Sequence, residues 1–205
     1  MEGKFKKSFV AVAVIVTLFS TWLLAAGGDQ IPKGWFKSCM HPSEYVIKVD
    51  KKVMKDGNAS LLIESLNPKD EKDIGNLMQV ISADNYLGKR LRLSGEIKTE
   101  KVDAAACLWM RVDGEKIGPN NPSLSFDNMF TRAPKGTTDW KKYEIVLDVP
   151  ANAKTINFGL MLIKTGKAWF SNLKIEEVGK DVPVTGFPTM PQNLAKQPVN
   201  LNFEE

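Results

Sequence analysis

The fold is decided by the stretch Gly136-Thr137-Thr138-Asp139-Trp140-Lys141-Lys142-Tyr143-Glu144-Ile145-Val146-Leu147-Asp148-Val149-Pro150, a polar turn that runs into a strand. In its second half Tyr143, Ile145 and Leu147 alternate with Glu144, Val146 and Asp148. Alternation of this kind is the period of a β-strand with one buried face. Proline has no N–H to donate to a sheet, so the strand should end before Pro150.

Short segments of the same kind occur on both sides of this stretch, separated by turn residues such as Asp56-Gly57-Asn58. The expected strands are 44–49, 59–65, 76–82, 90–98, 104–113, 124–129, 141–149, 155–163 and 167–177. After the N-terminal segment, no window has the period of a helix. Short strands at this spacing predict an all-β protein, a jelly-roll β-sandwich over residues 31–178.

Alternation also assigns side chains to faces of the expected strands. In 90–98 one face carries Leu91, Leu93 and Ile97. In 104–113 the apolar face carries Ala106, Leu108, Met110 and Val112, and the opposite face carries Cys107, Trp109, Arg111 and Asp113. The apolar faces should form the core. We expect Trp35, Trp140 and Trp169 to lie in the core or at its rim, since large rings dominate burial.

The N-terminus has the composition of an export segment. Lys4, Lys6 and Lys7 precede an apolar run from Phe9 to Ala26, which is followed by small residues. This order predicts a signal peptide over 1–26. The run is also nearly long enough to cross a bilayer, so an uncleaved N-terminal membrane anchor is the alternative. In both cases the rest of the chain lies outside the cytoplasm: secreted, periplasmic or membrane-anchored.

Charge and motifs exclude several classes of function. The chain carries a net charge of +4, and removing residues 1–26 takes away three Lys and one Glu, which leaves a nearly neutral protein. Such a chain lacks the basic surface that nucleic-acid binding needs. No nucleophile elbow, phosphate loop or zinc spacing is present, so we expect neither an enzyme nor a cofactor. Cys39 and Cys107 form either a disulfide or two free thiols.

Four segments together resemble the galactose-binding-domain-like superfamily, which includes many carbohydrate-binding modules: Gly34-Trp35-Phe36, Gly57–Leu61, Gly136–Pro150 and Gly166–Leu173. The segments Leu108–Gly114 and Phe126–Met129 are also similar to sandwich domains attached to some bacterial transcription regulators and exported proteins of unknown ligand. The resemblance covers residues 34–178. It implies a β-sandwich whose task is binding, although one fold hosts many functions.

The chain departs from this family at its ends. Such domains begin with a strand of the pattern N-L-x-F-E, which here occurs only at Asn200–Glu204. A Pro-rich linker over 179–198 precedes the segment 199–205, and our hypothesis is that this segment returns as the first strand. The alternatives are a strand donated to a second molecule, giving a strand-swapped homo-oligomer, or the start of a further domain.

The resemblance also raises the question of a structural calcium ion. Related modules often hold Ca²⁺ with the Glu of the first strand and an acidic pair in the closing strand. Glu204 could supply the first of these carboxylates. Ser171 and Asn172 stand where the acidic pair would be, which lowers the charge available to the ion.

A ligand site is expected around Trp109. A flat ring can cover the apolar face of a sugar, while amide, carboxylate and guanidinium groups bind its hydroxyls. The expected site residues are Trp109, Arg111, Asp113, Gln79, Arg92, Asp127 and Asn128. The other interpretation is a packed Trp109 with Arg111 paired to a carboxylate.

The sequence thus predicts an exported non-catalytic module that binds carbohydrate or a small polar ligand. It would contact a membrane only through an uncleaved N-terminal segment. The first alternative is a protein-interaction or assembly module that uses the C-terminal strand, and the second is an enzyme of unknown type.

Overall fold

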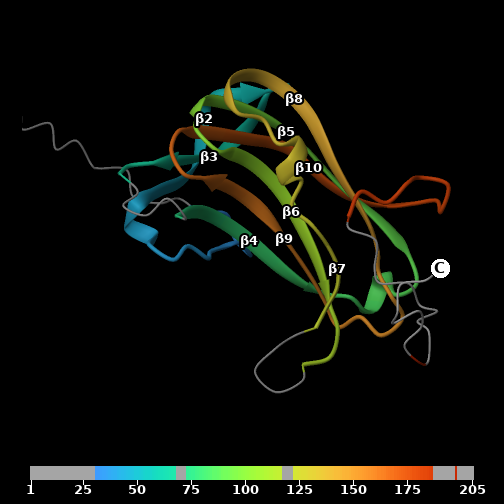
Figure 1. The fold of residues 1–205 in the computed structure, drawn as a ribbon. Coiled ribbons are helices and arrows are strands. Elements are labelled where there is room, and N and C mark those ends of the chain that lie inside the picture. Colours follow the sequence, from blue (N-terminus) through green and yellow to red (C-terminus); the bar gives the residue numbers. More distant parts are fainter. Residues whose placement is uncertain (1–30, 68–72, 117–121, 187–196, 198–205) are drawn as a thin grey trace, which may run out of the picture.

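The computed structural model describes residues 31–67, 73–116, 122–186 and 197. Its strands are β1 (Phe36–Lys37), β2 (Tyr45–Lys55), β3 (Asn58–Ser65), β4 (Ile74–Ser82), β5 (Arg90–Val102), β6 (Ala105–Asp113), β7 (Ser123–Asp127), β8 (Gly136–Asp148), β9 (Thr155–Ile163) and β10 (Lys167–Val178). Short 3-10 helices occur at Pro42–Glu44, Asp84–Tyr86 and Phe130–Arg132. The strands form two five-stranded antiparallel sheets, ordered β1-β4-β9-β6-β7 and β2-β3-β10-β5-β8, which pack face to face (Figure 1).

The all-β jelly-roll prediction is confirmed. Each expected strand is present, and β9 has the predicted bounds. β8 is longer than expected because its polar N-terminal half, from Gly136, also pairs with β5. The two-residue strand β1 was not expected, since so short a segment has no alternation to detect.

The core lies between the two sheets, where the alternation placed it. Leu91 and Ile97 on β5 have no exposed surface, and neither do Leu108 and Met110 on β6 of the opposite sheet. Phe170 on β10 is only 1% exposed. Complete burial of side chains of this size stabilises the fold by about 1.5–3 kcal/mol each.

The chain stays on the sandwich after β10. Arg90 donates to both carboxylate oxygens of Asp148 at 2.9 Å and to the backbone oxygens of Lys180 and Val182. Further on, the N–H of Thr185 donates to Val146 O at 2.9 Å. Residues 179–186, expected to belong to a linker, are therefore fastened to the β8 edge.

Two predicted segments, 1–26 and 199–205, lie outside the described residues. Within the described ranges, no helix is both long enough and apolar enough to cross a membrane.

Asp148 is expected to make a contribution to the stability of the fold that is lost in acid. Its hydrogen bonds with Arg90, aided by Lys180, lower the pKa of the carboxyl to about 2. A carboxyl whose pKa is lower in the folded state stabilises the fold above its ordinary pKa of about 4, and this stabilisation is lost as the pH falls toward 2. We expect Asp148→Asn to flatten the fall in the urea midpoint between about pH 4 and pH 2. An unchanged pH dependence in the variant would contradict this assignment.

Candidate functional site

Two tryptophans stand on the outer face of the sheet β2-β3-β10-β5-β8, which we call the tryptophan face. Ala168 and Phe170 turn inward on β10, so Trp169 between them points outward. Trp169 is only 7% exposed, and its indole N–H donates to Asp50 Oδ2 at 3.0 Å. Trp140 on β8 is partly exposed. The face therefore offers one partly exposed ring beside one packed ring.

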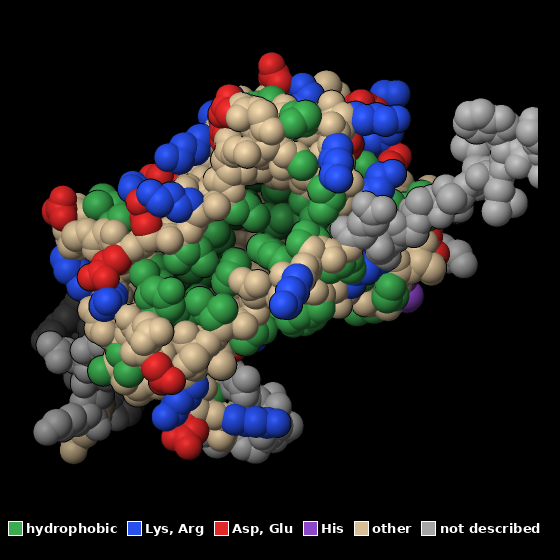
Figure 2. Space-filling model, turned by 180° about the vertical axis from the view of Figure 1, so that it is seen from behind, with side chains coloured by type: hydrophobic (Ala, Val, Ile, Leu, Met, Phe, Trp, Pro, Cys, Tyr) green, Lys and Arg blue, Asp and Glu red, His purple; other side chains and the backbone are tan. Residues whose placement is uncertain are grey.

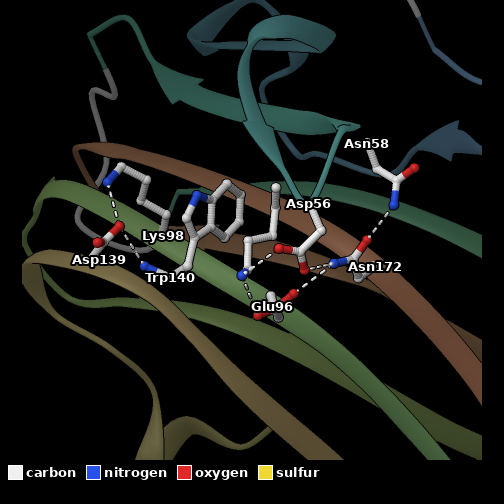
Figure 3. A network of polar contacts seen from close by, with 8 residues as sticks. Asp56, Asn58, Glu96, Lys98, Asp139, Trp140 and Asn172 are labelled. Atoms are coloured by element: carbon white, nitrogen blue, oxygen red, sulfur yellow. Dashed lines mark hydrogen bonds and ion pairs between the residues drawn. The ribbon is translucent and has the colours of Figure 1, made fainter.

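A polar network borders Trp140 on one side (Figure 3). The Nδ2 of Asn172 donates to Glu96 Oε2 at 2.7 Å and to Asp56 Oδ2 at 3.3 Å. Its Oδ1 accepts from Asn58 Nδ2 at 2.9 Å. Lys55 Nζ lies 3.0 Å from Asp56 and 3.5 Å from Glu96. Sheet pairing brings the β2–β3 hairpin, β5 and β10 together here. Asn172 lies in a bulge of β10 and adopts a positive φ of 51°. Asparagine tolerates that conformation better than most residues.

An ion pair borders the ring on its other side. Lys98 Nζ lies 2.8 Å from Asp139 Oδ1, which also accepts the backbone N–H of Trp140 at 2.8 Å. The hydrogen bond from Lys98, together with the N–H of Trp140, lowers the pKa of Asp139, because both donors favour the charged carboxylate. In the view of Figure 3, the ring of Trp140 lies between this pair and the network around Asn172. The arrangement places a flat apolar surface between fixed donors and acceptors.

Trp109 lies on the outer face of the other sheet and is packed. It is 8% exposed, and its indole N–H donates to Asn76 Oδ1 at 2.8 Å. The ring lies against Gly159 on β9, where a Cβ atom would come within 2.6 Å of the indole nitrogen. Little of the ring is open to a ligand in this position.

Arg111 and Asp113 share the face of Trp109, as alternation predicted. The guanidinium of Arg111 lies 2.8 Å from Asp113 Oδ2, and Asn157 Nδ2 donates to the same oxygen at 3.0 Å. Asp113 is 1% exposed, and its Oδ1 is the one buried side-chain oxygen or nitrogen without a hydrogen-bond partner among the described residues. Arg111 retains partial exposure and is engaged by the carboxylate beside it.

The other predicted site residues are dispersed. Gln79 on β4 donates to Gly34 O at 3.2 Å and so holds the loop before Trp35. Arg92 pairs with Glu176 at 2.9 Å. Both residues lie on the sheet that does not contain Trp109. The expectation that Arg92 neighbours Trp109 is wrong, because β5 and β6 follow each other in sequence but belong to different sheets.

Asp127 and Asn128 end β7 and belong to a corner of the sandwich. Asp127 Oδ2 lies 2.6 Å from Arg132 and accepts the hydroxyl of Thr185 at 2.6 Å. Asn128 Oδ1 accepts the N–H of Phe130 within the following turn. Both side chains thus hold local backbone in place, and their role in ligand binding stays a prediction.

The possible disulfide is corrected by the structure, in which Cys39 and Cys107 are both free thiols. Cys39 contacts Asn76 on β4, and Met161 on β9 lies between Asn76 and Cys107 in the sheet. Asn76, which Cys39 contacts, is therefore two strand spacings, about 10 Å, from Cys107. A disulfide joins Cα atoms that are at most about 7 Å apart. Burial raises the pKa of the Cys107 thiol to about 12, so it is inert at neutral pH.

The calcium hypothesis depended on Glu204, which lies outside the described residues. Within the described part of the chain, no group of three or more His, Cys, Asp or Glu side chains could hold a metal ion. Asn172, which occupies a position of the expected acidic pair, is engaged by its neighbours on the tryptophan face.

The tryptophan face was missed by sequence reasoning. Trp140 and Asp139 lie within the stretch that identified the fold, but Trp140 was expected in the core or at its rim. The usable signal was the polar sequence around it, Thr138-Asp139-Trp140-Lys141, since a ring among charged residues at a strand's start favours a face open to solvent.

No family model matches this chain. A curated relative, the uncharacterized HTH-type transcriptional regulator YbfP of Bacillus subtilis (strain 168), is 44% identical over 173 residues, which are 84% of this chain and 57% of YbfP. The chain thus spans little more than half of that relative.

Solved structures share the fold at low identity, and two of them serve as examples. The enzymatically active domain of tailspike protein 4 from bacteriophage CBA120 matches with a TM-score of 0.53 and 18% identity, over 71% of this chain and 20% of that one. The CBM22-1 xylan-binding domain of Paenibacillus barcinonensis Xyn10C matches with a TM-score of 0.50 and 13% identity, over 73% of this chain and 89% of that domain. The chain therefore has the jelly-roll β-sandwich fold found in carbohydrate-binding modules, as its resemblance to galactose-binding-like domains predicted.

Proposed function

We propose that this chain is an exported, non-catalytic module that binds carbohydrate through the tryptophan face. The observation that carries the proposal is the partly exposed ring of Trp140, set between the Lys98–Asp139 pair and the network around Asn172. The C–H face of a pyranose stacks on an aromatic ring, while its hydroxyl groups need both donors and acceptors. This face supplies all three kinds of contact.

The polar groups of the face are held before a ligand arrives. Asn172 is fixed by three hydrogen bonds, and Asp139 is fixed by Lys98 and by the N–H of Trp140. A site whose side chains are already ordered loses less conformational entropy on binding. The arrangement therefore suits a ligand that is itself rigid and rich in hydroxyl groups.

The comparisons suggest which ligands to test first. One structural neighbour is a xylan-binding domain, so xylan and related plant polysaccharides are the first probes. Export is supported by the basic and apolar N-terminal segment, and lack of catalysis by the absence of a catalytic motif in the sequence.

Substituting the partly exposed Trp140 tests the proposal. We expect Trp140→Ala to weaken binding to the best polysaccharide on a glycan array by about 5- to 150-fold, since loss of an aromatic ring on which a ligand stacks costs about 1–3 kcal/mol. Binding is measured by isothermal titration and affinity electrophoresis. The matched control is Phe36→Ala, which removes a largely exposed ring from β1 of the other sheet.

Three outcomes would count against the proposal. The tryptophan face is excluded if Trp140→Ala binds the polysaccharide as tightly as the unmodified chain, or if Phe36→Ala weakens binding by as much. Carbohydrate binding is excluded if no glycan on the array binds. The non-catalytic assignment fails if incubation with the bound polysaccharide releases reducing ends.

A further inference from the structure

The second half of β10 is paired on one side only among the described residues. Over Lys167–Phe170, β10 pairs with both β3 and β5. Beyond the bulge, Lys174–Val178 pairs with β5 alone. The antiparallel neighbour β3 starts at Asn58 and therefore does not extend alongside this part of β10. In a strand of this kind, alternate N–H and C=O groups point away from the paired neighbour. An unpaired row of such groups is a template for another strand.

An apolar cavity opens beside this edge. It has a volume of about 220 Å³ and lies between the sheets, with Trp35, Leu61, Leu77, Leu160, Phe170 and Leu173 among its lining residues. Seen from behind the view of Figure 1, hydrophobic side chains line a hollow between the two layers (Figure 2). Leu173 belongs to β10 itself, so the free edge and the cavity are continuous. A strand that paired here would cover the opening.

We propose that residues 199–205 of this same chain pair with Lys174–Val178 as an additional strand. In Val199-Asn200-Leu201-Asn202-Phe203-Glu204-Glu205 the apolar side chains alternate with polar ones. A strand places alternate side chains on opposite faces. When the segment lies against β10, Val199, Leu201 and Phe203 enter the cavity and the asparagines face solvent.

The chain is long enough to reach this edge. Thr185 is bound to Val146, Val146 pairs with Arg92, and Arg92 pairs with Glu176 in a single row across the sheet. The vacant position beyond Glu176 is four strand spacings from Thr185, which is about 19 Å. The intervening segment of about 13 residues can span roughly 40 Å when extended. The tail is therefore long enough to reach the edge of its own molecule.

Deletion of residues 199–205 from the full chain tests the inference. We expect the melting temperature to fall by about 10 °C and binding of an apolar dye to rise, because the cavity loses its cover. A peptide of sequence 199–205, added to the truncated chain, should reverse both changes.

Point variants provide matched controls that do not depend on the truncated chain folding. Leu201→Asp and Phe203→Asp should lower the melting temperature, whereas Asn200→Asp and Asn202→Asp, which add the same charge on the other face, should leave it nearly unchanged. In the full chain, the edge-facing amides among Lys174–Val178 should exchange slowly with solvent and become fast in Leu201→Asp.

The inference is overturned if the deletion leaves the melting temperature unchanged, if both pairs of variants act alike, or if the edge amides exchange fast in the full chain. A dimer that dissociates on deletion would assign the segment to a second molecule and overturn pairing within one chain. Binding of glycans at the tryptophan face does not depend on these results, so the inference and the proposed function can fail separately.

Discussion

Replacing Trp109 by alanine is expected to lower the free energy of unfolding by about 3–5 kcal/mol, as large-to-small changes at packed aromatic positions do. The ring is 8% exposed, lies over Gly159 and donates its indole N–H to Asn76 at 2.8 Å. Its removal leaves a cavity and also leaves the Asn76 oxygen without its donor, which adds a desolvation cost. For a chain of this size the melting temperature should fall by roughly 10 °C.

Thermal and urea unfolding of two companion variants separates the causes. Trp109→Phe keeps a ring over Gly159 but loses the N–H, so it should cost less than the alanine variant. Trp140→Ala, at a partly exposed ring, should change stability by less than about 1 kcal/mol. A Trp109→Ala protein as stable as the unmodified chain would show that the ring is not part of the packing.

Replacing Asp127 by alanine is expected to lower the free energy of unfolding by about 2–3 kcal/mol. This carboxylate is 5% exposed and accepts from Arg132 at 2.6 Å, from the Thr185 hydroxyl at 2.6 Å and from the N–H of Met129 at 2.7 Å. Loss of one partner from a buried pair costs about 3–5 kcal/mol, and the partial exposure of Arg132 reduces that figure through solvent screening.

The control for this prediction is the next residue. Asn128→Ala removes one hydrogen bond, to Phe130 in an exposed turn, and should cost about 1 kcal/mol or less. Asp127→Asn retains an acceptor without the charge, so its loss of stability should lie between those of Asp127→Ala and Asn128→Ala. If urea unfolding shows Asp127→Ala no less stable than Asn128→Ala, Asp127 does not organise this corner.

The strands could be predicted because each is a local pattern. Tyr143, Ile145 and Leu147 alternate with polar neighbours in β8, and the same logic placed Leu91 and Ile97 inside with no exposed surface. Alternation is set by the geometry of a single strand, so it needs no knowledge of the partner strands. Fold class and the faces of the long strands therefore follow from sequence alone.

The site could not be predicted in the same way, because it depends on which strands meet. Arg92 and Trp109 lie on strands that follow each other in sequence, yet these strands belong to opposite sheets. Trp109 is packed because Gly159, 50 positions away in the chain, leaves room for its ring. Neither fact has a local signature. The same holds for Asn172, which meets Asp56 and Glu96 only through sheet pairing.

The most direct test of the account is to map where a bound oligosaccharide lies. Backbone and indole N–H signals are followed by nuclear magnetic resonance while the chain is titrated with a xylan oligosaccharide or the best glycan from the array. We expect the largest shifts at Trp140, Lys98 and Asn172 on the tryptophan face. Shifts centred instead on Trp109 and Arg111 would contradict the account.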